Sequence, residues 1–394
     1  MSIEGELKFE LLCRDHHIRR VRIRSSRPLQ LPLLFEGKRV EEVLHMIPML
    51  YSVCATAQAG AAAMACRQAL GLGVERRVAL AESMLVWLET AREHLWRMLI
   101  DWPGFSGDAV DREQVAALSQ LIPQGKQACF GSQGGAFTLQ PSLQYDAVAF
   151  GQLIDRLERT LATAIFGMPP SAWAGMTTAD EFHRWIEDGA TPAARHLSWV
   201  KQAGFGNLGD AAVGPLPQID AAALDRRLQQ ADADRFVTAP DWGESPCETS
   251  PLTRQHAHPL VRALRPIYGN GLLSRLAARL TELASIPAQL QNRSQALADD
   301  DTLEPAAPSS RGSEVGLGTV EAARGRLTHR ATLADGVVSR YQILAPTEWN
   351  FHPEGVVARG LIGFPCGDET SFRRQVELFI KAVDPCVGYS LEFA

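Results

Sequence analysis

The sequence has no run of about 18 apolar residues, so it offers no candidate for a membrane-spanning helix. Its first residues, MSIEGELKFELLCRDHH, carry early acids and no apolar stretch, and they do not form a secretory signal. Basic charge is not in excess, because 39 basic and 45 acidic residues give a net charge of −6. This balance argues against a protein that binds nucleic acid through a basic face.

Cysteine is scarce and odd in number, with seven residues spread thinly along the chain. Together with the missing export signal, this predicts a cytoplasmic protein with free thiols rather than a disulfide framework. There is no Cys-x-x-Cys, no His-Glu-x-x-His and no cysteine–histidine cluster, so a closed zinc site is not expected. His256 and His258 are better explained by hydrogen bonding or solvation than by a shared ion.

The glycines of GLGTVE, Gly316 and Gly318, resemble part of a phosphate-binding loop, but no apolar strand precedes them. We therefore do not assign nucleotide binding.

What is present is an ordinary globular composition, 46% hydrophobic and 21% charged over 394 residues, which is long enough to bury a large core. Apolar residues at helical spacing predict helices over 76–102, 147–167 and 271–286. Pro103 and Gly104 should end the first of them, and Thr178 could cap a further helix. The fold class is mainly α with small antiparallel β elements (α+β).

The patterns suggest one domain over residues 1–394. Asp335-Gly336 between two alternating runs signals the second hairpin. The predicted order is an N-terminal β-hairpin (5–35), a helical body (36–290), a mobile loop (292–313), and a β-hairpin with a C-terminal helix (314–394).

Two cysteines stand out by their context. Pro48 should interrupt the preceding helix, so Cys54 is expected to open a new one, where unpaired backbone amides would favour its thiolate. Cys386 lies in DPCVGY, directly after the last predicted helix. The alternative, commoner for a lone cysteine, is a small buried apolar residue, and the residues alone leave both interpretations open.

Four segments together resemble the large subunit of nickel–iron hydrogenases. Residues 31–62 and 258–284 are similar to its first cysteine region and to a weakly patterned middle region. Residues 316–355 resemble its Glu-x-x-Arg-Gly-x-Leu-x-His hairpin and the Pro-Thr-x-Trp-Asn that follows it. DPCVGYSLE resembles its final Asp-Pro-Cys-x-x-Cys-x-x-His. The last two matches are the most specific, and the resemblance implies a large-subunit-like helical bundle.

The departures from that pattern fall on the nickel ligands. The resemblance implies two Cys-x-x-Cys pairs, of which this chain keeps only the second member of the first pair, Cys54, and the first member of the second pair, Cys386. The other motif positions hold Tyr51, Gln58, Tyr389 and Glu392. Tyrosine oxygen is a poor substitute for a soft thiolate, so no nickel is expected.

The groups that the family uses around the iron are retained. The resemblance implies that Arg324 and Thr347 would donate hydrogen bonds to two cyanides, with Pro346 packing beside them, while Cys54 and Cys386 would bind the iron. Ala323 stands where proline is usual, which leaves the rigidity of this hairpin in question. The chain stops at Ala394, where the family's precursors carry a cleavable tail, and no such processing is expected.

These features resemble the HupK/HoxV type of hydrogenase accessory protein. The resemblance implies a non-enzymatic scaffold that holds an Fe(CN)2CO unit transiently. The partners that it implies are a HypC-type chaperone, a HypD-type scaffold and the hydrogenase large subunit. Two alternatives remain open: a metal-free, protein-binding paralogue that assists large-subunit assembly, and a divergent active hydrogenase.

Overall fold

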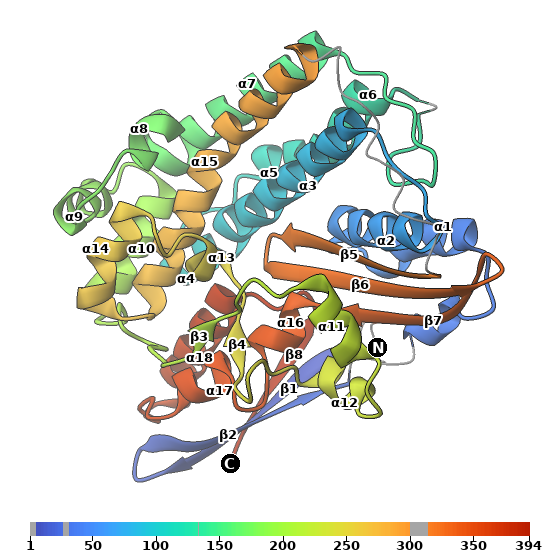
Figure 1. Cartoon of the computed structure of the whole chain (residues 1–394). Helices are drawn as coiled ribbons and strands as arrows, with labels where there is room; N and C mark the ends of the chain where they lie inside the picture. The colour runs from blue at the N-terminus through green and yellow to red at the C-terminus, as the bar shows by residue number, and fades with distance from the viewer. Residues whose placement is uncertain (1–4, 27–30, 133, 300–313) are drawn as a thin grey trace.

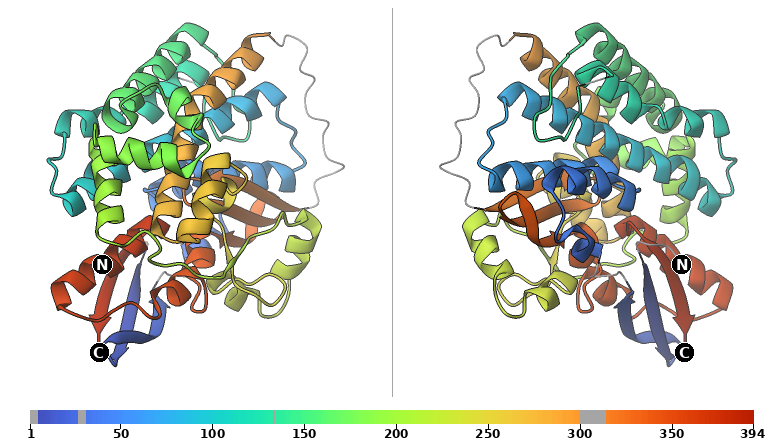
Figure 2. Two further views of the ribbon diagram at one scale, coloured as in Figure 1. Left: turned by 90° about the vertical axis from the view of Figure 1, so that its left-hand side faces the viewer. Right: turned by 90° about the vertical axis from the view of Figure 1, so that its right-hand side faces the viewer.

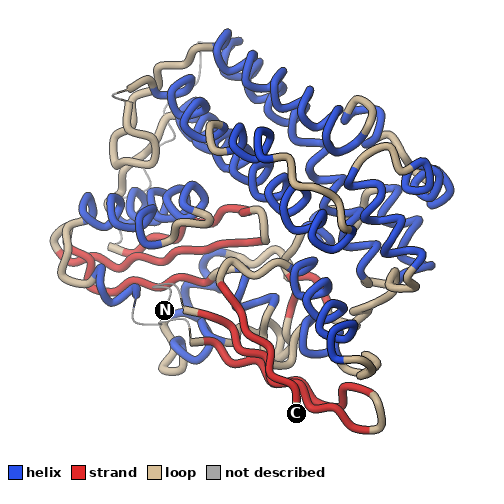
Figure 3. The backbone as a smooth tube through the Cα atoms, turned by 180° about the vertical axis from the view of Figure 1, so that it is seen from behind, coloured by secondary structure: helices blue, strands red, loops and turns tan. Residues whose placement is uncertain are grey.

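The computed structural model describes residues 5–26, 31–132, 134–299 and 314–394. It has a large helical body with two three-stranded sheets along one side (Figures 1 and 3). This arrangement confirms the predicted α+β class. No helix among the described residues is both long and apolar enough to cross a membrane.

The helical body is built around α15 (Leu272–Asp299), which packs against α3 (Arg76–Trp96), α7 (Ala147–Thr160) and α8 (Pro170–Ala174) (Figure 1). Its other elements are η2 (Arg97–Asp101), α4 (Trp102–Ser106), α5 (Arg112–Leu118), α6 (Leu121–Phe130), η3 (Leu161–Phe166), α9 (Ala179–Asp188), α10 (Pro192–Gln202), α13 (Pro251–Arg254) and α14 (Pro259–Tyr268). Thr178 caps α9 through a capping box, as predicted.

The first sheet has the order β5-β6-β7, with β5 (Val315–Ala322), β6 (Gly325–Ala334) and β7 (Val337–Leu344) antiparallel. It confirms the predicted hairpin at Asp335-Gly336 and adds a third strand. The alanine-rich helix α2 (Ala55–Ala69) packs directly on β5.

Two glycines explain this close approach. A Cβ on Gly316 or Gly318 would lie 2.0 or 1.9 Å from a backbone oxygen of α2. The glycines of GLGTVE therefore allow a helix to pack on a strand, and they do not form a phosphate loop.

The second sheet joins the two ends of the chain. β1 (Glu6–Arg14) pairs antiparallel with β2 (His17–Ser25), as predicted, and parallel with β8 (Gly388–Phe393), which was not predicted. The labelled ends lie close to this sheet in Figure 2. Its apolar face covers α17 (Val356–Leu361) and α18 (Glu369–Val383) in a second core.

A disulfide joins Cys13 in β1 to Cys366 in the loop before α18. The expectation that all seven cysteines are free thiols is therefore wrong for this pair. This pairing could not be predicted from the sequence, because 353 residues separate the two cysteines and only the fold brings them together. The other five cysteines are free, among them Cys54 and Cys386.

The remaining elements connect these parts. They are η1 (Leu31–Phe35), α1 (Val40–Leu50), β3 (Gly214–Pro215), β4 (Cys247–Glu248), α11 (Ala221–Leu228), α12 (Ala233–Thr238) and α16 (Pro346–Asn350).

Two predicted helix ends are wrong, and both involve proline. α1 continues through Pro48 to Leu50, because a proline in the last turn removes only one hydrogen bond. Pro103 lies in the first turn of α4 instead of ending the preceding helix, since a missing N–H is tolerated in a first turn. The π-helical turn η2 (Arg97–Asp101) links α3 to α4, and the run ends at Gly107, where φ is 84°.

The predicted loop at 292–313 is wrong for residues 292–299, which belong to α15. Residues 300–313 lie outside the described residues. His256 and His258 each contact a backbone oxygen, of Thr253 and Ala174 respectively, in agreement with the hydrogen-bonded role expected for them.

Candidate metal-unit site

The two cysteines singled out from the sequence come together from opposite ends of the chain. Cys54 directly precedes α2, as predicted, and Cys386 follows α18 in the turn that leads to β8. Cys54 is partly exposed and Cys386 is buried. They lie near enough to interact electrostatically, since, besides burial, Cys386 raises the pKa of Cys54 while Arg324 lowers it. Arg324 is thus near both sulfurs, which also act on its own pKa.

Arg324 lies in the tight turn between β5 and β6. The turn requires glycine at 325, where φ is +139° and a Cβ would lie 2.3 Å from the carbonyl oxygen of Thr249. Asn350 of α16 donates to the carbonyl of Arg324, at 3.1 Å, and Arg254 donates to the carbonyl of Ala323, also at 3.1 Å. The turn is therefore held by side-chain hydrogen bonds although alanine replaces proline.

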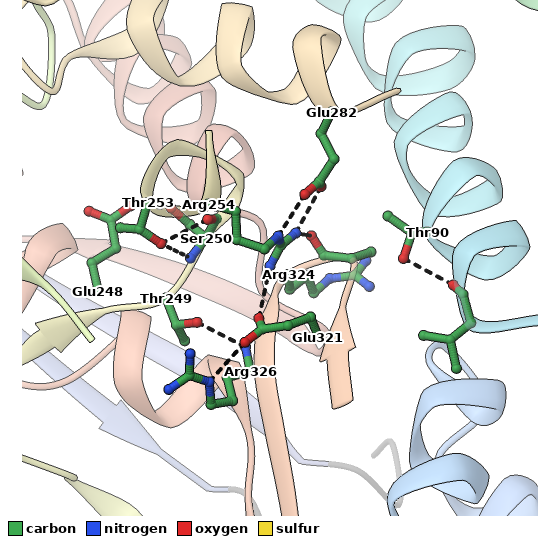
Figure 4. A network of polar contacts seen from close by, with 12 residues as sticks. Thr90, Glu248, Thr249, Ser250, Thr253, Arg254, Glu282, Glu321, Arg324 and Arg326 are labelled. Atoms are coloured by element: carbon green, nitrogen blue, oxygen red, sulfur yellow. Dashed lines mark hydrogen bonds and ion pairs between the residues drawn. The ribbon is translucent and has the colours of Figure 1, made fainter. Parts of the chain in front are cut away.

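Figure 4 shows the polar network that supports this turn from the helical side. Arg254 bridges Glu282 of α15, at 2.6 Å, and Glu321 of β5, at 3.5 Å. Glu282 also contacts the buried His94, at 2.7 Å. Although burial opposes ionisation, Arg254 holds the pKa of Glu282 down at about 2, so this carboxylate stays charged.

Buried carboxylates orient the Arg324 side chain. Its Nη2 contacts Glu93 at 3.0 Å, and its Nε lies 3.2 Å from Asp384. Asp384 also pairs with Arg97 at 2.8 Å and with Arg279 at 3.5 Å. Burial alone would raise the pKa of Asp384, but these three guanidinium groups hold it well below its usual range.

Two nitrogens of Arg324, Nε and Nη1, are buried without a hydrogen-bond partner among the described residues, and Nε is ion-paired with Asp384. A buried guanidinium N–H without an acceptor is costly, and an anionic acceptor would satisfy it well.

Thr347 contacts Cys386, and Pro346 precedes Thr347 in the chain. Both begin α16 and both are buried. The hydroxyl of Thr347 lies 2.9 Å from the sulfur of Cys386 and also accepts from its backbone N–H at 3.4 Å. The structure therefore brings the five residues named from the sequence to one region, namely Cys54, Arg324, Pro346, Thr347 and Cys386.

The prediction that unpaired backbone amides at the start of α2 favour the Cys54 thiolate is wrong. The first amides of α2 are not free, because the carboxylate of Glu89 accepts from Thr56 N and Ala57 N at 2.7 and 2.8 Å. Burial, Cys386 and Glu89 together raise the pKa of Cys54 well above its ordinary value, although Arg324 and Gln58 act in the opposite direction. The thiol is therefore protonated at neutral pH, and a metal must displace its proton.

The positions where the hydrogenase pattern has its other two cysteines and its final histidine have different surroundings. Tyr51 is buried and acts electrostatically on Tyr341. Tyr389 lies in β8 with its ring 6.0 Å from that of Phe9, and Glu392 forms an ion pair with Lys8 at 2.6 Å. Within the described part of the chain, no group of three or more histidine, cysteine or acidic residues could hold a metal ion.

Sequence reasoning missed three acids at this site. Asp384 could have been found, since it directly precedes Pro385-Cys386 in the recognised motif. Glu89 and Glu93 carried no such signal, because they lie among many charged residues of a long helix and only the fold turns them inward.

Comparisons with known proteins identify the fold and the family. The family model for nickel-dependent hydrogenase matches residues 194–391. The NiFeSe hydrogenase from Desulfovibrio vulgaris Hildenborough superposes with a TM-score of 0.67 at 17% identity, covering 98% of this chain and 96% of that one. The molecule therefore has the fold of a nickel-dependent hydrogenase large subunit.

Relatives with more similar sequences identify the family more narrowly. The hydrogenase expression/formation protein HoxV of Cupriavidus necator is 31% identical, with 94% of this chain and 92% of the relative covered. HupK of Azotobacter vinelandii is also 31% identical, with 98% of each covered. The chain belongs to this family of HoxV, HupV and HupK hydrogenase expression/formation proteins.

Proposed function

We propose that this protein is an accessory scaffold in hydrogenase maturation that holds an Fe(CN)2CO unit and passes it to the hydrogenase large subunit. The names of its relatives support a part in hydrogenase formation rather than catalysis. The observation that carries the proposal is that Cys54 and Cys386 lie near enough to interact electrostatically with each other and with Arg324, whose buried Nη1 lacks an acceptor among the described residues.

The ligand count fits a cargo better than a resident metal. Two cysteine sulfurs cannot close a metal site by themselves, and the described residues offer no third ligand of the usual kinds. An Fe(CN)2CO unit brings three ligands of its own, so two thiolates complete only part of its coordination. Such a site can hold the unit and still release it.

The surrounding groups have defined tasks in this proposal. The free N–H of Arg324 would donate to one cyanide, and the hydroxyl of Thr347 to the other. The ion pairs to Glu93 and Asp384 fix the direction of the guanidinium. Because Cys54 is protonated before loading, iron binding expels a proton, and hand-over to the recipient returns one. Nickel is not part of the proposed cargo.

HypC-type and HypD-type proteins are the proposed donors of the unit, and the large subunit is the proposed recipient. We place these steps in the cytoplasm and propose no enzymatic activity.

The proposal is tested by producing the protein together with the maturation machinery and recording metal content and infrared spectra. We expect iron without nickel, and absorption bands of cyanide and carbonyl. Cys54→Ala should abolish the bands. Cys66→Ala is the matched control, because Cys66 is a free, buried cysteine of α2, the helix that Cys54 precedes, and its loss should leave the bands intact.

A second candidate is a metal-free, protein-binding paralogue, favoured by the protonated state of Cys54. Absence of iron and of all diatomic bands from the wild-type protein, with retained binding to the large subunit, would select this alternative. Nickel together with hydrogen-dependent dye reduction would instead select a divergent hydrogenase.

A further inference from the structure

A chain of three side-chain hydrogen bonds leads through the core to the sulfur of Cys54. Tyr341 Oη lies 2.8 Å from His329 Nδ1, and His329 Nε2 lies 2.7 Å from Gln58 Oε1. Gln58 Nε2 donates to Cys54 Sγ at 3.6 Å. The residues come from β7, β6 and α2, and Tyr341, His329 and Gln58 are all buried.

The chemistry of these groups fixes which group donates in each hydrogen bond. Burial lowers the pKa of His329 to about 3, so its ring is neutral and carries one N–H. The amide oxygen of Gln58 can only accept, so that N–H must be at Nε2. Nδ1 is then an acceptor, and the Tyr341 hydroxyl donates to it. With its oxygen committed to His329, the amide of Gln58 presents its NH2 group to the sulfur.

We propose that Gln58, oriented by His329 and Tyr341, is a positioning residue that keeps the sulfur of Cys54 a hydrogen-bond acceptor turned toward the iron unit. This inference rests on the proposed function, because the sulfur is taken as an iron ligand. The sulfur of a thiol accepts hydrogen bonds only weakly, whereas a metal-bound thiolate accepts more strongly, so this hydrogen bond should strengthen when iron binds. The amide donor draws electron density from the sulfur without adding a charge beside Arg324. The bond to iron is thereby weakened, which suits a protein that must give its cargo away.

The proposal predicts a spectroscopic signature that a purely structural role would not produce. In Gln58→Met the side chain keeps a similar length but offers no N–H. The sulfur then donates more electron density to iron, and the carbonyl band of the loaded protein shifts to lower frequency. Gln58→Asn, which retains an amide, is the conservative variant and should return the band toward its wild-type position.

Gln68→Met is the matched control. Gln68 lies on the same helix, and its side-chain oxygen accepts from Leu317 N at 2.8 Å, remote from the sulfur. This variant loses a hydrogen bond of similar kind and should leave the carbonyl band in place.

The direction of these hydrogen bonds is measured separately in the metal-free protein, by nitrogen NMR of His329. We expect a neutral ring protonated at Nε2 in the wild-type protein. A ring protonated at Nδ1 would overturn the inference alone, as would an unshifted carbonyl band in Gln58→Met. Absence of any carbonyl band from the wild-type protein would overturn the proposed function, and with it the role assigned to Gln58.

Discussion

Asp384 forms ion pairs with three arginines of the site, and Asp384→Asn tests how much these ion pairs stabilise the fold. The substitution keeps the shape of the side chain and removes its charge from three guanidinium groups at 2.8, 3.2 and 3.5 Å. Asp384 is only 2% exposed, so solvent cannot replace the lost charge. Breaking a buried ion pair from one side costs about 3–5 kcal/mol, and we expect a loss of unfolding free energy of that size.

Urea denaturation at neutral pH measures this loss, with Asp234→Asn as the control. Asp234 pairs with Arg340 at 3.2 Å, but its side chain is 86% exposed, and removing such a pair costs about 0–1 kcal/mol. Since the pKa of Asp384 is depressed in the folded state, its contribution is complete above its unfolded pKa of about 3.9 and disappears at lower pH. The difference from wild type should therefore shrink in acid. A loss below about 1 kcal/mol at neutral pH would refute the reasoning.

Two further predictions concern His196 and Glu89. His196 stacks on Trp102 and has no partner for either ring nitrogen among the described residues, and burial lowers its pKa to about 3. Because the unfolded chain takes up this proton below about pH 6.5 and the folded protein does not, the free energy of unfolding should fall there by about 1.4 kcal/mol per pH unit. His196→Phe should remove that part of the slope in denaturation measured from pH 7 to 5, and an unchanged slope would contradict this assignment. Glu89→Gln should lower stability by about 2 kcal/mol, because one of two charge-assisted hydrogen bonds to the α2 amides is lost, and should speed alkylation of Cys54. Unchanged alkylation would show that the charge of Glu89 does not reach the thiol.

Most of the fold could be predicted where the pattern is local. Periodicity indicated α3, α7 and α15, and the Asp335-Gly336 dipeptide indicated the hairpin of β6 and β7. The pairing of β1 with β8 could not be predicted, since the register of distant strands is set by tertiary packing. The disulfide from Cys13 to Cys366 depends on the contact of the β1–β2 hairpin with the segment before α18, including the bridge between His17 and Pro365, and it was missed for the same reason.

The residues of the candidate site also fall into those that could be predicted from the sequence and those that could not. Arg324, Thr347 and Cys386 lie in motifs that are recognisable in the sequence, whereas their surroundings depend on helices that carry no motif. Glu89 is the clearest case. The position of Cys54 before a helix suggested an activated thiol, but this carboxylate, from a neighbouring helix, occupies the amides that would have activated it.

The central claim is that two sulfurs from opposite ends of the chain bind one iron. X-ray absorption at the iron edge of the loaded protein tests it most directly, because it counts the sulfur neighbours of the metal. The account predicts two sulfur neighbours in the wild-type protein and one in Cys386→Ser, with Cys66→Ala unchanged. Iron without sulfur neighbours, or with the same two in Cys386→Ser, would contradict it.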